Sequence, residues 1–151
     1  VYQEYYAAGK ARAIGVSNYC PSCLACITTR GAGAGTVPAV NQVRYHAGMT
    51  ADPAGIMGYS RAHGVVPMAY SPMGGGAVFT DALLSRIGAA HGKTPAQVAL
   101  RWIAAKNYTL ATKASGRGHL EEDLDVFSWG LTDEEAAEID GYSAGNDTYS
   151  W

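Results

Sequence analysis

The chain alternates short apolar runs with segments whose apolar residues recur at helical spacing. The apolar runs predict four strands, at Ala11–Val16, Ala39–Val43, Val65–Tyr70 and Tyr108–Lys113. Each run is followed by residues that can start a helix. Strands that alternate with helices in this way favour a parallel sheet with right-handed connections, so the pattern predicts an α/β fold.

The ends of the helices are predicted from capping residues, prolines and glycines. We expect helices from Pro21 to about Arg30, from the Asp52–Pro53 pair to His63–Gly64, from a Thr80 cap to His91, from the Thr94–Gln97 capping box to about Lys106, over His119–Val126, and after the Thr132–Glu135 capping box. No linker or change of composition divides these elements. Residues 1–151 are therefore expected to form a single domain.

Composition narrows the function without fixing it. Hydrophobic residues make up 48% of the 151 residues and charged residues 16%, which is typical of a globular protein. A net charge of -2 gives no electrostatic reason to expect nucleic acid or an acidic membrane surface as a partner. Because no apolar run approaches the roughly 20 residues that span a bilayer, we expect no membrane insertion and a soluble protein. Its compartment, whether the cytoplasm or an organelle interior, stays unknown at this point.

The three cysteines lie close together in the segment CPSCLAC, as Cys20, Cys23 and Cys26. This spacing occurs in iron–sulfur and zinc sites, but a fourth ligand of matching type is missing. An odd number of cysteines does not favour a disulfide framework either. We expect no metal site, and three side chains packed along one side of a helix.

Polar and aromatic side chains gather where the predicted strands end. Ser17 and Asn18 follow the first strand, Gln42 lies late in the second, Tyr70 closes the third and Lys113 closes the fourth. The carboxyl ends of parallel strands form the ligand-binding edge of α/β sheets. Amides suit a carboxamide, an aromatic ring suits a flat ring, and a lysine suits a phosphate. Polar residues are also common in ordinary loops, so a site is one of two readings.

Two glycine-rich segments invite comparison with phosphate-binding loops. The segment GAGAGT at 31–36 precedes a strand instead of joining a strand to a helix, so that mechanism does not apply to it. Met73–Gly76 follows a strand directly, where its backbone amides can approach phosphates. A flexible turn remains the alternative for this second segment.

Five ordered stretches of this sequence resemble the aldo-keto reductase family. They are AIGVSNY, PAVNQVRYH, GVVPMAYSPMG, HGKTPAQVALRWIAAKN, and the region from TLATKAS to EEDLDVFSWGLTDEEAAEI. The resemblance implies a (β/α)8 barrel of the TIM type. It implies further that only the C-terminal half is present, with strands five to eight and the closing helices.

The resemblance also implies an NADP(H) site and assigns residues to it. In that family a serine, an asparagine and a glutamine hold the nicotinamide carboxamide, an aromatic residue stacks on the ring, and the following loop and a lysine bind phosphates. The matching residues are Ser17, Asn18 and Gln42 for the carboxamide, Tyr70 for stacking, Ser71 and Met73 for the loop, and Lys113 for phosphate.

Departures from the family pattern lie at the adenine end of this implied site. His119 stands where the family has an arginine for the 2′-phosphate, and Glu122–Asp123 stands for a Glu-Asn pair. Arg117 is a candidate substitute for that arginine, although a bidentate guanidinium is not easily relocated. Ala114 replaces the serine of the family's Pro-Lys-Ser turn. The choice between NADPH and NADH therefore stays open.

The family's catalytic Asp, Tyr, Lys and His come from its first four strands, which have no counterpart here. We therefore expect no catalytic residue in this chain, and no activity from it alone. The implied function is the cofactor-binding half of an oxidoreductase that acts on a small carbonyl compound. The alternative is a non-catalytic structural or regulatory subunit.

Half a barrel would leave both outer strands unpaired and one apolar face open. Three kinds of partner could cover that face: the missing N-terminal half-barrel, a second copy of the chain, or a larger protein assembly.

Overall fold

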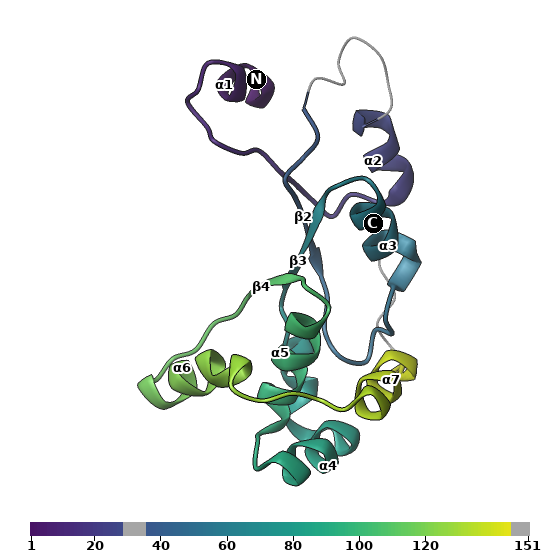
Figure 1. The fold of residues 1–151 in the computed structure, drawn as a ribbon, viewed down its shortest axis with the longest axis vertical. Helices are drawn as coiled ribbons and strands as arrows, with labels where there is room; N and C mark the ends of the chain where they lie inside the picture. Colours follow the sequence, from purple (N-terminus) through teal and green to yellow (C-terminus); the bar gives the residue numbers. More distant parts are fainter. Residues whose placement is uncertain (29–35, 146–151) are drawn as a thin grey trace. The chain divides into compact units, whose positions relative to one another are not determined.

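The computed structural model describes residues 1–28 and 36–145 (Figure 1). Contacts within the chain divide it into two compact units. The first unit comprises Val1–Val43 and Asp52–Met68 within the described residues. The second comprises Arg44–Ala51 and the described residues from Ala69 onward. The expectation for GAGAGT falls almost wholly outside the described residues.

The first unit holds two helix–strand pairs. Its elements are α1 (Tyr2–Ala7), β1 (Val16–Ser17), α2 (Pro21–Thr28), most of β2 (Val40–Arg44), the 3-10 turn η2 (Pro53–Gly55), α3 (Ile56–Ala62) and the start of β3 (Val66–Tyr70). Helices α2 and α3 pack against each other, and their buried residues Leu24, Ile56 and Met57 form the core of this unit.

The second unit is built around helix α5. Its elements are η3 (Gly74–Thr80), α4 (Ala82–His91), α5 (Pro95–Ala105), β4 (Thr109–Ala111), α6 (Arg117–Leu124), η4 (Asp125–Phe127) and α7 (Asp133–Gly141). Helix α5 contacts α4, α6, β4, η3 and η4. Its Trp102 is buried and stacks on Tyr45, with 4.9 Å between the ring centroids. One long amphipathic helix thus organises the core of this unit.

The four strands form one sheet in the order β1-β2-β3-β4. Strands β1 and β2 are parallel, with Val16 opposite Asn41 and Ser17 opposite Gln42. Between β2 and β3, the Tyr45 N–H donates to the Tyr70 carbonyl at 3.3 Å. Because strand order follows sequence order and helices connect the strands, the α/β prediction is confirmed.

The predicted strand Ala11–Val16 is wrong in its extent. Only Val16 pairs from that range, and β1 continues to Ser17. Before Val16, the Ile14 carbonyl accepts the Ala39 N–H at 2.8 Å, whereas the Ala11 N–H donates back to the Tyr5 carbonyl at 3.2 Å. Apolar residues alone do not make a strand, because its length is set by the partner with which it can form a ladder. The other three strands lie within about one or two residues of their predicted ends.

Two helix starts differ from prediction. Thr80 does not cap α4, because Asp81 takes that position and its carboxylate accepts the Leu84 N–H at 3.0 Å. The helix expected after Asp52 begins with η2 and becomes α-helical at Ile56, while the Asp52 carboxylate accepts the Met57 N–H at 2.8 Å. Both aspartates therefore act as caps, one of them after an intervening turn.

Other expected helices are confirmed at their capped ends. The Thr94–Gln97 and Thr132–Glu135 capping boxes both form, and Gly92 ends α4 in the left-handed conformation. The helix expected over His119–Val126 begins earlier, at Arg117, and gives way to η4 after Leu124. Helix α1 was not expected, because its tyrosine-rich sequence carries no capping signal. No helix among the described residues is long and apolar enough to cross a membrane.

For two glycines within helices, we expect an added methyl group to have opposite effects on the free energy of unfolding. A Cβ on Gly88 would lie 2.4 Å from the Lys93 carbonyl oxygen, whereas one on Gly118 would meet nothing within 4 Å. We expect Gly88→Ala to lower the free energy of unfolding by about 1–3 kcal/mol through overpacking. We expect Gly118→Ala to raise it by about 0.5 kcal/mol, since alanine restricts the unfolded chain. Urea unfolding of both variants checks the pair, and equal effects would contradict this packing.

Candidate functional site

The predicted carboxamide-binding residues of the first unit lie together where β1 ends beside the middle of β2. The Gln42 carbonyl accepts two hydrogen bonds, from the Ser17 hydroxyl at 3.0 Å and from the Asn18 N–H at 2.8 Å. Asn18 has a φ of 56°, so the chain turns sharply as it leaves β1. The side chains of Ser17 and Asn18 are exposed and that of Gln42 is half-buried. Donors and acceptors of the amide type are thus available at this edge.

A buried asparagine that was not predicted holds this turn in place. Asn41 is fully buried and points away from Gln42, its neighbour in β2. Its Oδ1 accepts the Tyr19 N–H at 3.2 Å and its Nδ2 donates to the Tyr19 carbonyl at 2.8 Å. The alternation in VNQVR did not distinguish Asn41 from a surface asparagine, and only its two hydrogen bonds to Tyr19 show how the buried amide is satisfied.

In the second unit, the chain leaves β3 through a tight glycine-rich turn. Ser71 has a φ of 52°, and the glycines at 74, 75 and 76 also have positive φ. A Cβ on Gly74 would lie 2.9 Å from the His46 ring, so only glycine lets the turn rest on this buried histidine. Gly74 begins the 3-10 segment η3, whose backbone departs from helical dihedral angles at Gly75 and Gly76.

This turn and the end of β4 line one cleft of about 490 Å³ in the second unit. Its lining residues are Ser71, Pro72, Met73, Gly75, Gly76, Phe79, Ala111, Thr112 and Lys113. A second cavity of about 250 Å³ shares Met73, Phe79 and Lys113 with it. The second cavity adds Ala96, Ala114, Ser115, His119, Glu122 and Asp123. The cleft and the second cavity therefore adjoin at three shared side chains.

The structure brings most of the predicted second-unit residues together. Ser71, Met73, Lys113, His119, Glu122 and Asp123 line the cleft or the adjoining cavity. Tyr70 lies at the end of β3 and is half-buried, but it lines neither of them. Phe79 and Thr112 were missed because neither stands at a position that the resemblance assigns. Ser17, Asn18 and Gln42 belong to the first unit.

Two carboxylates, those of Glu122 and Asp123, belong to the lining of the adjoining cavity. The His119 ring lies 3.3 Å from a Glu122 carboxylate oxygen. Burial raises the pKa of the Asp123 carboxyl; the Thr112 hydrogen bond opposes this, the Glu122 charge adds to it, and the His119 charge opposes it. The lining of this cavity thus carries two carboxylates, one lysine and one histidine.

Arg117 does not take the place of the missing arginine. Its Nε donates to a Glu121 carboxylate oxygen at 2.7 Å, and its side chain is 92% exposed. It lines neither the cleft nor the adjoining cavity. The cationic fork expected for a 2′-phosphate is therefore not supplied by this residue.

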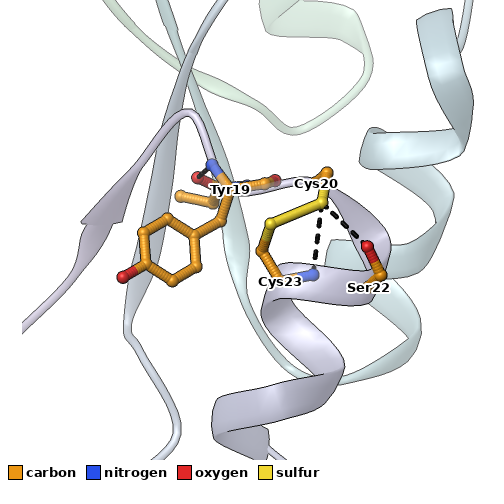
Figure 2. The surroundings of a disulfide bond; sticks show 5 residues. Tyr19, Cys20, Ser22 and Cys23 are labelled. Carbon is orange, nitrogen blue, oxygen red and sulfur yellow. Dashed lines mark hydrogen bonds between the residues drawn. A yellow bond between two sulfur atoms is a disulfide. The ribbon is translucent and has the colours of Figure 1, made fainter. Parts of the chain in front are cut away.

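The cysteine segment differs from expectation. Cys20 and Cys23 form a disulfide at the start of α2 (Figure 2). Cys26 keeps a free thiol. The prediction that the three would simply pack along a helix is thus wrong for two of them. An even number of cysteines is not required when one of three stays free. Among the described residues, no group of three or more His, Cys, Asp or Glu could hold a metal ion.

The model of the aldo/keto reductase family matches residues 2–144 of this chain. The chain belongs to this family. It is 33% identical over 137 residues to an aldo-keto reductase of Mycobacterium sp. (strain MCS), covering 91% of this chain and 47% of that protein. It is also 33% identical over 150 residues to morphine 6-dehydrogenase of Pseudomonas putida, covering 91% of this chain and 49% of the relative.

Solved structures of the family share the fold. A mutant of Gox0644 in complex with NADPH matches 99% of this chain and 54% of that chain, with 27% sequence identity and a TM-score of 0.89. The chain thus spans about half the length of the relatives it matches. The expected fold class, a partial (β/α)8 barrel of four strands and their helices, is confirmed.

The raised pKa of Asp123 predicts how stability depends on pH. The folded pKa lies above the unfolded value, so its contribution is fully present below the unfolded pKa and is lost as pH rises through the folded pKa. Asp123→Asn removes this loss. We expect the variant to be more stable than the parent at neutral pH, by less than about 1 kcal/mol because the site is partly exposed. Urea unfolding between acid and neutral pH measures it.

Glu122→Gln is the matched control for this prediction. It removes a neighbouring charge that raises the Asp123 pKa and leaves the Asp123 carboxyl itself titratable. We expect the parent's pH dependence to persist in reduced form. An Asp123→Asn variant with the same pH dependence as the parent would show that burial of this carboxyl has no energetic effect.

Proposed function

We propose that residues 1–151 form one domain, the cofactor-binding C-terminal half of an NAD(P)H-dependent aldo-keto reductase. The observation that carries the proposal is the second-unit cleft, where Lys113 and the turn after β3 converge in a chain with this family's fold. The likeness to a family structure in complex with NADPH adds to it. The whole enzyme would transfer hydride between the nicotinamide and a small carbonyl or alcohol substrate.

The residues present fit most of such a cofactor. The bound dinucleotide would supply the hydride. In the first unit, the Asn18 and Gln42 side chains provide amide donors and acceptors for the carboxamide, and Ser17 adds a hydroxyl. Tyr70, at the end of β3, is the proposed stacking ring.

The phosphate groups would bind in the second unit. Gly75 and Gly76 line the cleft without side chains, so a phosphate can approach the backbone there, while Gly74 packs on His46. Lys113 supplies the cation, and Ser71 and Met73 belong to the same lining.

At the adenine end, the same fit is poor for a 2′-phosphate. Glu122 and Asp123 place two carboxylates in the adjoining cavity, where His119 is already paired with Glu122. Like charges repel a phosphate there. We propose that this site discriminates weakly between NADPH and NADH.

No residue of this chain is proposed as catalytic. The Asp, Tyr, Lys and His that the family uses would come from the remaining half of the barrel. The substrate is proposed no more narrowly than a small carbonyl compound. The relatives that match include both a morphine 6-dehydrogenase and proteins named only as aldo-keto reductases.

An apolar groove in the second unit supports a covering partner. Its volume is about 680 Å³, and its apolar lining residues are Leu100, Ala104, Tyr108, Leu110, Leu120, Leu124, Val126 and Phe127. Leu124 is 74% exposed and Phe127 is 77% exposed. We propose the complementary N-terminal half-barrel as its cover, since the chain has about half the length of its relatives.

The cofactor proposal is tested by titrating the chain with NADPH and NADH and following nicotinamide fluorescence. We expect saturable binding of both cofactors. Lys113→Ala should weaken binding about 10-fold or more, because a charge-assisted hydrogen bond to phosphate is lost. Lys10→Ala, which removes an equal charge from the first unit, is the matched control and should leave both affinities unchanged. Binding that Lys113→Ala and Lys10→Ala affect equally would sink the proposed site.

The partner proposal is tested by the intact mass of the natural protein. A mass about twice that of this 15.8 kDa chain is expected, and that whole protein should oxidise NADPH in the presence of an aldehyde. A natural mass equal to that of this chain, together with no cofactor binding, would instead support the structural or regulatory subunit.

A further inference from the structure

The sequence Cys20-Pro21-Ser22-Cys23 places two sulfur atoms at the exposed start of a helix, a feature that hydride transfer does not use. Cys20 immediately precedes α2, and its carbonyl accepts the Leu24 N–H at 2.9 Å, so Cys20 is the N-cap residue. Cys20 is half-buried and Cys23 is exposed. Solvent thiols can therefore reach the pair from the Cys23 side.

The two sulfur atoms have different surroundings. The Cys20 Sγ accepts the Cys23 N–H at 3.2 Å and lies 3.0 Å from the Ser22 hydroxyl oxygen (Figure 2). An N–H and a hydroxyl directed at one sulfur favour negative charge on it, as does the positive end of the helix dipole. Within the described part of the chain, the Cys23 sulfur has neither an N–H nor a hydroxyl directed at it.

We propose that Cys20 and Cys23 form a redox-active dithiol–disulfide pair that exchanges with thiols and disulfides. Three independent features support this assignment: the disulfide itself, the exposure of Cys23, and the two donors that stabilise a Cys20 thiolate. The co-reactant is a thiol, either a small monothiol or a protein dithiol.

With a monothiol, the exchange takes place in two steps. An external thiolate attacks the Cys23 Sγ, the Cys20–Cys23 bond breaks, and its electron pair remains on the Cys20 Sγ as a thiolate. A second external thiolate then attacks the external sulfur of the mixed disulfide and releases Cys23 as a thiolate. Both cysteine thiolates take up protons. Two external thiols are oxidised to one disulfide, and the protein gains two electrons and two protons.

The backbone next to the pair is held independently of the disulfide. Tyr19, which directly precedes Cys20, is bound through both its N–H and its carbonyl by the buried Asn41 side chain. Opening the disulfide breaks neither hydrogen bond. We therefore expect reduction to leave the fold of the chain intact, as reversible exchange requires.

The first test counts thiols in the folded chain by alkylation and mass spectrometry, with circular dichroism to follow the fold. One alkyl group per chain is expected before reduction, on Cys26, and three after reduction, without loss of helical signal. Three reactive thiols in the air-oxidised chain, or reduction only after unfolding, would overturn the proposal.

Defined mixtures of reduced and oxidised glutathione then test reversibility. The parent and Cys26→Ser should titrate alike between disulfide and dithiol, whereas Cys20→Ser and Cys23→Ser should show no such transition. A glutathione adduct on Cys23 would identify a monothiol as co-reactant. Reduction by dithiothreitol but not by glutathione would identify a dithiol. Loss of the transition in Cys26→Ser would show that the pairing is wrong.

The third test compares two thiols of the same reduced chain. At neutral pH, Cys20 should be alkylated faster than Cys26, and Ser22→Ala should slow Cys20 alone by about 2- to 10-fold, since one hydrogen bond to the thiolate is lost. Equal rates for Cys20 and Cys26 in the parent would contradict a stabilised Cys20 thiolate. These readouts involve no cofactor, so they stand apart from the outcome of the NADPH experiments.

Discussion

The geometry of the first unit depends on the parallel pairing of β1 with β2. At the end of this short ladder, one oxygen atom, the Gln42 carbonyl, accepts hydrogen bonds from both Ser17 and Asn18. One residue earlier, Asn41 holds the next backbone unit through its side chain. Few strand residues are involved, yet they fix the direction in which the chain enters α2. This arrangement sets the positions of two features: the amides that we propose bind the nicotinamide, and the Cys20–Cys23 pair.

In the second unit, the turn after β3 and the end of β4 meet at the same cleft. Helix α5 packs against β4, η3, α4 and η4, so it braces both walls. The turn itself requires a glycine at position 74, because His46 occupies the space beneath it. Lys113 follows β4 and faces the cleft that this turn encloses. The phosphate-binding position that we propose thus depends on packing below the turn as much as on the charge beside it.

Much of this organisation was predictable from local signals. Capping boxes at Thr94 and Thr132 and the apolar runs of β2 and β3 gave elements close to those observed, because these signals act over a few residues. The extent of β1 was not predictable in this way, since it depends on pairing with residues about 25 positions away. The resemblance to the family located the cleft residues around Lys113.

Some features of the site were not accessible from sequence. The role of Asn41 emerges only when the turn that it holds is seen, because the same alternation would suit a surface asparagine. The disulfide was not predicted although the start of α2 at Pro21 was, because spacing alone does not show that the Cys20 and Cys23 sulfur atoms meet. Pairing of Arg117 with Glu121 likewise depends on where α6 begins. These are properties of three-dimensional position rather than of spacing.

The open groove of the second unit also affects how stability varies with temperature. Unfolding raises the heat capacity mainly by exposing apolar surface to water. Leu124 and Phe127 are already largely exposed in the native chain, so they contribute little to that change. The stability curve of the chain should therefore be flatter, per residue, than that of a complete barrel in which such side chains are covered. By the same reasoning, a partner that covers this groove would bind with a negative change in heat capacity, which calorimetry detects without any knowledge of the substrate.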